Sequence, residues 1–237
     1  MLPFILVPAG IAAVVWGIKV LFEDEHETLD RLLHDVSGRR VAIVGERETG
    51  KTTLNNYIHS GSVTLDYDAT TFPEQMRGRR FKIGDLKLKA KKTRDVSGSD
   101  DRYGDWKQEI HKADATLYLC RLDRLLDGDA KTIERTQQDA RYIAEVQNGS
   151  KVFLVGTFAD KVPGWLHAVQ VKDQAAFEDE LRERREFRRI VGMLGGFSSV
   201  DVVIGTLVMD PYSDPVRYGA PEGCESVVSS VFRELYQ

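Results

Sequence analysis

The chain has 237 residues, of which 42% are hydrophobic and 30% are charged, and its formal net charge at pH 7 is −4. A chain of this length and apolar content can bury the core of one α/β domain and carry an additional segment. The acidic balance argues against nucleic acid as a partner, because binding to phosphates needs a clustered basic surface. The two cysteines, Cys120 and Cys224, lack metal-binding spacing and are expected to pack in the core of a protein from a reducing compartment.

Residues 1–22 form an apolar run in which Lys19 is the only charged side chain. A helix of about 20 apolar residues spans a bilayer, and no basic residue precedes the run as a secretory signal would require. We therefore predict an uncleaved, single-pass transmembrane anchor over 1–22, with a removed signal peptide and a buried hydrophobic helix as the alternatives. Because Arg31, Arg39 and Arg40 follow the run and nothing basic precedes it, the rest of the chain should face the cytoplasm.

Residues 23–38 are predicted to form a helical connector, because their leucines recur at helical spacing. The remaining residues, 39–237, are predicted to form one domain. Its first strand is expected over 40–44, where the residues are apolar and β-branched, and its first helix over 51–59.

The turn between that strand and that helix carries the pattern G-x-x-x-x-G-K-T, which is the phosphate-binding P-loop pattern. Its glycines allow backbone N–H groups to surround phosphate oxygens, and the helix that follows begins with its positive end at the ligand. Lys51 would reach the β- and γ-phosphates, and the Thr52 hydroxyl would ligate Mg²⁺. The residues expected to contact the nucleotide here are Gly45, Glu46, Arg47, Glu48, Thr49, Gly50, Lys51, Thr52 and Thr53.

Hydrophobic periodicity and turn residues predict the later elements. In chain order these are a loop over 60–76, a hairpin of strands 79–83 and 86–93, a helix over 102–112, a strand over 115–122, a helix over 129–147, a strand over 151–156, a helix over 173–193, a strand over 200–208 and a helix over 225–236. Strands with continuous apolar runs that alternate with helices predict an α/β fold of three layers, with a mostly parallel sheet covered on both faces. The hairpin would add one antiparallel edge strand.

Two further patterns follow predicted strands. In Asp95-x-x-Gly98 a carboxylate can hold Mg²⁺ through water and a glycine N–H can contact the γ-phosphate. In Thr157-Phe158-Ala159-Asp160, the Asp160 carboxylate could accept hydrogen bonds from N1–H and the exocyclic amine of guanine, groups that adenine does not present in that arrangement.

The P-loop, Asp95-x-x-Gly98 and the Asp160 segment, in this order, resemble the motifs of small Ras-superfamily GTPases. The segment Asp95-Val96-Ser97-Gly98, followed by Trp106, looks most like the Arf-like branch. The beta subunit of the signal-recognition-particle receptor is similar and also carries an amino-terminal membrane anchor. The resemblance covers residues 39–237 and implies a P-loop NTPase fold (a G-domain) that binds GTP or GDP with Mg²⁺.

The resemblance also implies roles for particular residues. A switch threonine that ligates Mg²⁺ would be Thr70 or Thr71, and Thr52 and Asp95 would complete the metal site. Thr157 and Phe158 stand where the family has Asn and a Lys that packs over the base. A backbone contact to the guanine oxygen is expected at Gly205-Thr206-Leu207, with Ser198-Ser199 as the poorer candidate.

One departure from the family concerns hydrolysis. Ser99 occupies the position of the family's water-orienting Gln, and a serine is too short for that task. Together with Lys51, Asp95 and Gly98 it would make up the catalytic set. Hydrolysis is therefore expected to be slow unless Gln75, His111 or a partner supplies the missing group; the alternative is that Ser99 is only a turn residue.

These patterns predict a membrane-anchored, GTPase-like switch that acts on an unidentified effector and is assisted by an unidentified activating protein. The alternatives are a catalytically silent nucleotide-binding scaffold subunit in a membrane complex and a P-loop ATPase of another branch.

Overall fold

The computed structural model describes residues 39–61, 63, 74–76, 79–83, 86–90, 93–95, 103–211 and 215–235, with the backbone alone for the segments between 74 and 95. All of them belong to the second of the two units into which the chain divides, Met1–Gly38 and Arg39–Gln237. The predicted anchor and connector, and also Thr70, Thr71, Gly98 and Ser99, lie outside the described residues. Within the described ranges, no helix has the length and apolar character needed to span a bilayer.

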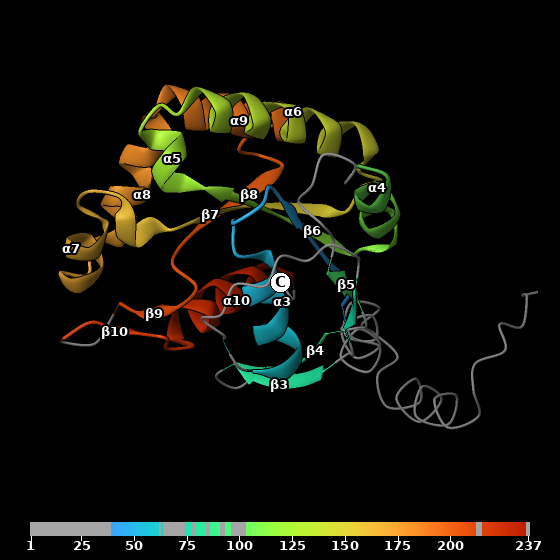
Figure 1. Cartoon of the computed structure of the whole chain (residues 1–237), viewed down its shortest axis with the longest axis horizontal. Helices are drawn as coiled ribbons and strands as arrows, with labels where there is room; N and C mark the ends of the chain where they lie inside the picture. The colour runs from blue at the N-terminus through green and yellow to red at the C-terminus, as the bar shows by residue number, and fades with distance from the viewer. Residues whose placement is uncertain are drawn as a thin grey trace, which may run out of the picture. The chain divides into compact units, whose positions relative to one another are not determined.

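A sheet of four parallel strands forms the centre of the domain, in the order β1-β6-β7-β8 (Figure 1). Its strands are β1 (Val41–Gly45), β6 (Ala115–Arg121), β7 (Lys151–Thr157) and β8 (Val200–Ile204). In the register, Gly45 lies opposite Leu119, and Arg121 lies opposite Thr157. Because the strands are parallel, their carboxyl ends meet at one edge of the sheet, and the α/β prediction is confirmed.

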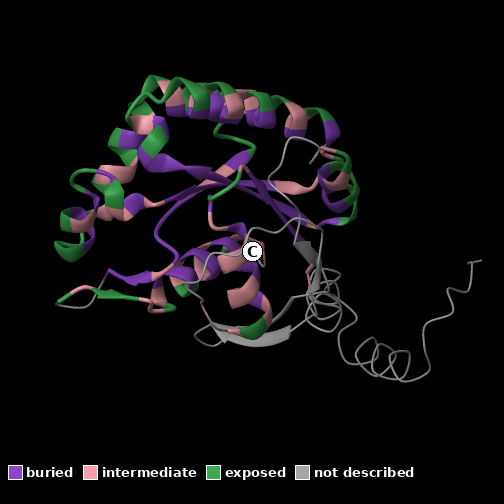
Figure 2. Ribbon diagram, in the orientation of Figure 1, coloured by how far each residue is buried: buried purple, intermediate pink, exposed green. Residues whose placement is uncertain are grey.

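Helices cover both faces of this sheet. They are α3 (Lys51–Ser60), α4 (Tyr103–Lys112), α5 (Leu122–Leu126), α6 (Ala130–Val146), α7 (Trp165–Gln170), α8 (Gln174–Glu183), α9 (Arg185–Leu194) and α10 (Glu222–Leu235). Alternate residues of β1 point to opposite faces: Ala42 and Val44 pack in a cluster with α4, α6 and α9, whereas Val41 and Ile43 pack with α3 and α10. Figures 1 and 2 show the resulting three layers, with buried strands between helices whose outer surfaces are exposed.

Antiparallel pairing occurs outside this sheet. The strands β3 (Arg79–Ile83) and β4 (Leu86–Ala90) form the predicted hairpin, β2 (Glu74–Met76) pairs with β5 (Thr93–Asp95), and β9 (Met209–Asp210) pairs with β10 (Arg217–Tyr218). Each pair is a separate two-stranded ladder, so the predicted antiparallel edge strand is wrong for the described residues.

The predicted boundaries around the hairpin also need correction. The segment Glu74–Met76, predicted as loop, is a strand, and the second arm of the hairpin ends at Ala90 instead of continuing to 93. A three-residue strand is too short to show an alternating pattern, and only its partner Thr93–Asp95 reveals it.

The single helix predicted over 173–193 is two helices. Arg184 leaves the helical conformation, with φ −65° and ψ 129°, between α8 and α9. The break allows α9 to bury Phe187, Ile190 and Leu194, whereas α8 buries only Leu181. Both cysteines are buried and unpaired, as predicted for packing residues.

Candidate functional site

The turn that follows β1 folds back on itself at the amino end of α3. Glu48 has φ 61° and Gly50 has φ 88°, so left-handed residues recur within the turn, as they do in backbone turns that bind anions. The Thr49 hydroxyl donates to the carbonyl oxygen of Glu46 at 2.9 Å, and the Lys51 ammonium donates to the same oxygen at 2.6 Å. These two hydrogen bonds hold the Thr49 and Lys51 side chains against the backbone of the turn.

Close packing against backbone requires the glycine at Gly45, and the left-handed φ of 88° favours the glycine at Gly50. A Cβ atom at Gly45 would collide with the carbonyl oxygen of Leu119 in β6, and one at Gly50 would collide with the Cδ1 atom of Leu207. The P-loop therefore rests directly on β6 and on the turn that follows β8.

That second turn is joined to the turn after β7. The N–H of Gly205 donates to the carbonyl oxygen of Gly156 at 3.0 Å, and the N–H of Ala159 donates to the carbonyl oxygen of Gly205 at 3.3 Å. The structure thus brings together the P-loop, residues 157–161 and residues 205–207 at the carboxyl edge of the sheet. Of the predicted nucleotide-contacting segments, these three lie side by side.

Within these turns, Thr157 and Thr206 are buried, with relative exposures of 1% and 4%. The Thr157 hydroxyl donates to the carbonyl oxygen of Cys120 at 3.0 Å and so links β6 to β7. Asp160 is half-buried in a short 3-10 helix, Ala159–Lys161, that follows Phe158. The threonine thus has a structural bond of its own, while the Asp160 carboxylate stays accessible.

The predicted metal site is described in part. Thr52 lies half-buried in the first turn of α3, and Asp95 ends β5, which lies against β1 and α3. Among the described residues, no cluster of three His, Cys, Asp or Glu side chains is placed to hold a metal ion. A magnesium ion at such a turn takes most of its ligands from phosphate, hydroxyl and water oxygens, so the Thr52 position and the glycine-lined turn fit one.

His111 is in the wrong place to replace the missing glutamine. It lies near the end of α4, where its carbonyl oxygen accepts a hydrogen bond from Asn148 just before β7 begins. This is the amino edge of the sheet, opposite the P-loop. Gln75 lies in β2, where its backbone is paired with Arg94 beside the pair of Glu74 and Asp95.

Basic side chains of α5 and α6 interact with the acidic residues of the P-loop. The Arg124 guanidinium of α5 pairs with the Glu48 carboxylate at 3.4 Å. Burial, followed by repulsion from Asp139, raises the pKa of the Glu46 carboxyl, while Arg135, Lys131 and Arg124 oppose the rise. These cations favour an anionic ligand at the turn.

Two further groups near this edge belong to none of the sequence motifs and were not predicted as site residues. The first is Asp139, a fully buried carboxylate on α6 that accepts hydrogen bonds from the hydroxyls of Tyr103 at 2.8 Å and Tyr118 at 3.4 Å. The Tyr142 hydroxyl donates to the carbonyl oxygen of Tyr103, and their rings stack with centroids 4.2 Å apart. The start of α4 is therefore fastened to α6. The sequence offered one sign of this residue, because Asp139 is a charged residue on the inward-facing side of the predicted helix 129–147.

The second group is Arg121, whose guanidinium makes a bidentate ion pair with Asp123 and covers the ring of Phe158 with its Cζ atom 3.7 Å from the ring centroid. An arginine at the end of the apolar run 115–120 was the corresponding signal.

Replacing Asp139 with asparagine should change how stability depends on pH. Burial raises the pKa of the Asp139 carboxyl from 3.8 to about 6. Between about pH 4 and 6 the unfolded chain loses this proton while the folded chain keeps it, so stability falls as pH rises. Over that pH interval the unfolding free energy of Asp139→Asn should rise by about 3 kcal/mol relative to that of the unmodified chain. The figure comes from a shift of about two pKa units, each worth about 1.36 kcal/mol.

Urea unfolding of both proteins at pH 4, 5, 6 and 7 measures this difference. An exposed carboxylate of α8, in Asp179→Asn, is the matched control and should leave the profile unchanged. A difference between Asp139→Asn and the unmodified chain that stays constant across this range would show that Asp139 titrates normally.

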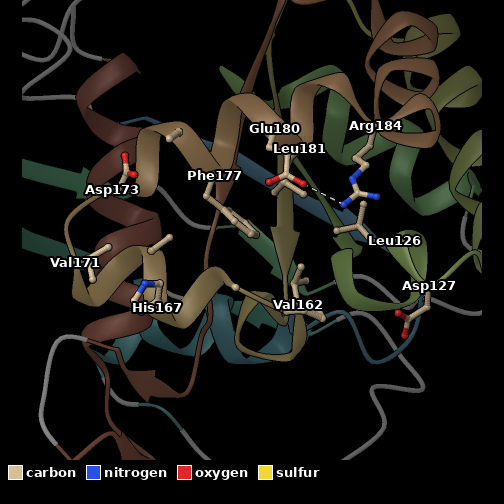
Figure 3. A pocket seen from close by; sticks show the side chains of 14 residues that line it. Leu126, Asp127, Val162, His167, Val171, Asp173, Phe177, Glu180, Leu181 and Arg184 are labelled. Atoms are coloured by element: carbon tan, nitrogen blue, oxygen red, sulfur yellow. Dashed lines mark hydrogen bonds and ion pairs between the residues drawn. The ribbon is translucent and has the colours of Figure 1, made fainter.

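A separate pocket of about 490 Å³ lies between α5, α7 and α8 (Figure 3). Glu180 and Arg184, which form an ion pair at 3.1 Å, lie on its wall with Phe177 and Leu126. None of the predicted nucleotide-binding residues lines it, so it is distinct from the three joined turns.

Comparison with protein families finds no match for the chain, and comparison with curated proteins finds none either. What is established is the class of fold: an α/β domain with a four-stranded parallel sheet, compatible with a P-loop-like fold.

Proposed function

We propose that the chain is a GTPase-like protein that binds GTP or GDP with Mg²⁺ at the carboxyl edge of its sheet. The observation that supports this most is the union of three turns: the P-loop, the Asp160 turn and the 205–207 turn are held together by backbone hydrogen bonds and by the contact of Leu207 with Gly50. This adjacency supports the proposal, because one nucleotide could contact all three turns.

In this proposal the P-loop N–H groups bind the β- and γ-phosphates at the amino end of α3. Lys51, which now donates to the Glu46 carbonyl oxygen, would donate to a phosphate oxygen instead. Thr52 and Asp95, with Thr70 or Thr71, would hold Mg²⁺, which supplies charge neutralisation at the phosphates. Asp160 accepts hydrogen bonds from the guanine edge, and Thr206 contributes its backbone beside the base.

Slow hydrolysis follows from Ser99 in the glutamine position, because a serine hydroxyl does not reach the attacking water. We propose that a partner supplies the missing group and that the nucleotide state controls the residues around 70 and 95–102. A membrane anchor over 1–22, with the domain on the cytoplasmic side, completes the proposal. A scaffold that binds nucleotide without turnover differs only in the absence of stimulated hydrolysis.

Replacing Asp160 with asparagine should weaken GTP far more than ATP. The carboxylate pairs with two donors of guanine, and loss of good bidentate pairing costs about 1–3 kcal/mol, or about 5- to 150-fold in affinity. ATP presents no such pair of donors and should change by less than about twofold.

Isothermal titration of the full chain with GTP and ATP measures both affinities. The control Asp179→Asn removes the same charge from an exposed position on α8 and should alter neither. Equal weakening of GTP and ATP by Asp160→Asn would remove the base-reading role of Asp160.

A further inference from the structure

Arg121 is the last residue of β6 and lies opposite Thr157, next to the turn that carries Phe158. Its side chain is held in two directions. Its Nε and Nη2 atoms donate to the two carboxylate oxygens of Asp123 at 2.8 and 2.6 Å, and its guanidinium plane covers the Phe158 ring. The residue is only 9% exposed, so the guanidinium is fixed in position.

Phe158 has a conformation that needs such support. Its φ of 59° is left-handed, a conformation that strains a residue with a Cβ. Phe158 is half-buried, so part of the residue is open to solvent. The Lys161 ammonium, on an exposed side chain, lies 4.9 Å from the ring centroid. The strained turn thus presents an aromatic ring beside Asp160.

The sheet register gives the location of Arg121 relative to the two ends of the proposed site: Leu119, two residues earlier in β6, lies opposite Gly45, and Arg121 lies opposite Thr157. Its pKa is raised, first by the hydrogen bonds to Asp123 and also by the carboxylates of Glu48 and Asp160. Glu48 belongs to the P-loop and Asp160 to the base turn. Arg121 therefore lies between the phosphate-binding and base-binding elements.

We propose that Arg121 is the positioning residue of a stacking platform for the purine base. In this proposal Arg121 holds the Phe158 ring from one face and the base stacks on the other, so the Lys161 ammonium, 4.9 Å from the ring centroid, must lie clear of that contact. The proposal rests on the proposed function, because it assigns how the base is held in that same site. An aromatic ring suits the ligand because every purine presents a flat π-face. The Arg121 guanidinium, on the opposite face of the ring, fixes the ring without contacting the ligand.

The test compares GDP with inorganic tripolyphosphate, which contains no base, in titrations of the full chain with Mg²⁺. Phe158→Leu keeps the Arg121–Asp123 pair and removes the ring, and Arg121→Met removes the support. We expect each variant to weaken GDP about 10-fold or more, as base stacking on an aromatic ring predicts, and to leave tripolyphosphate unchanged. Phe158→Tyr, which keeps the ring, should restore GDP binding.

The two substitutions should not be additive, because Arg121 acts through Phe158; the double variant should bind GDP as Phe158→Leu does. Unchanged GDP affinity in Phe158→Leu, or equal loss of GDP and tripolyphosphate in both variants, would overturn the platform. Failure of the unmodified chain to bind GDP would instead contradict the proposed function, so the two failures are distinguishable. If Arg121→Met does not fold, Phe158→Leu and Phe158→Tyr decide the matter by themselves.

Discussion

Substitution of Lys51 by alanine should strongly weaken binding of GTP and GDP while the domain stays folded. The ammonium group lies over the P-loop turn, 2.6 Å from the Glu46 carbonyl oxygen, and is nearly buried. Removing one member of a buried, hydrogen-bonded charge pair costs about 2–5 kcal/mol, so the affinity should fall by about 30- to 4000-fold. Titration of the full chain with GTP and GDP in the presence of Mg²⁺ measures the loss.

The matched control is Lys131→Ala. Lys131 is an exposed lysine of α6 whose charge also acts on Glu46, so the control removes a nearby positive charge without touching the turn. It should reduce affinity by no more than a few-fold, as exposed charges do. Equal effects of the two substitutions would mean that Lys51 contributes only general electrostatic attraction.

Substitution of Gly45 by alanine should both destabilise the domain and disrupt the P-loop. The added Cβ would meet the Leu119 carbonyl oxygen, a backbone atom of β6 that cannot rotate away, and φ at this position is 152°. Strain and collision together should cost about 2–4 kcal/mol of unfolding free energy. Chemical denaturation measures the loss of stability, and nucleotide titration measures the damage to the turn.

Gly128→Ala isolates the contribution of the collision. Gly128 also has a positive φ, of 78°, but no atom lies within 4 Å of its hypothetical Cβ. It should therefore cost about 1–2 kcal/mol, the penalty for a left-handed residue, and leave nucleotide affinity unchanged. If Gly45→Ala cost no more than Gly128→Ala, the β6 contact would not constrain the P-loop.

The strands and helices of the central domain could be predicted because their periodicity is long and clean. The predicted first strand, 40–44, and helix, 51–59, differ from Val41–Gly45 and Lys51–Ser60 by one residue at their ends. The helix over 129–147 is likewise close to Ala130–Val146, and its Asp129 caps the first turn by accepting from the Thr132 N–H. The continuous apolar runs of β6 and β7 predicted a parallel sheet, because strands that are buried on both faces show no alternation of apolar and polar residues.

Other features depend on tertiary contacts that no local pattern contains. The break at Arg184 separates α8 from α9, which buries Phe187 and Ile190, and the highly charged segment contains no local sign of that break. The five-residue helix Leu122–Leu126 and the six-residue helix Trp165–Gln170 are too short to show a helical period.

The candidate site divides in the same way. The P-loop turn could be predicted from its glycines, because the spacing itself specifies the backbone conformation. Arg121 and Asp139 could not, because their importance comes from Phe158 and Tyr103, which are brought to them by the packing of other elements.

The central claim is that this edge of the sheet binds a guanine nucleotide. The most direct test is to denature the purified full chain, identify any nucleotide released, and then titrate nucleotide-free protein with GTP and with ATP in the presence of Mg²⁺. The structure and motifs predict GTP or GDP in the released fraction, tighter binding of GTP than of ATP, and slow turnover. Tighter binding of ATP, or binding of neither nucleotide, would contradict the claim.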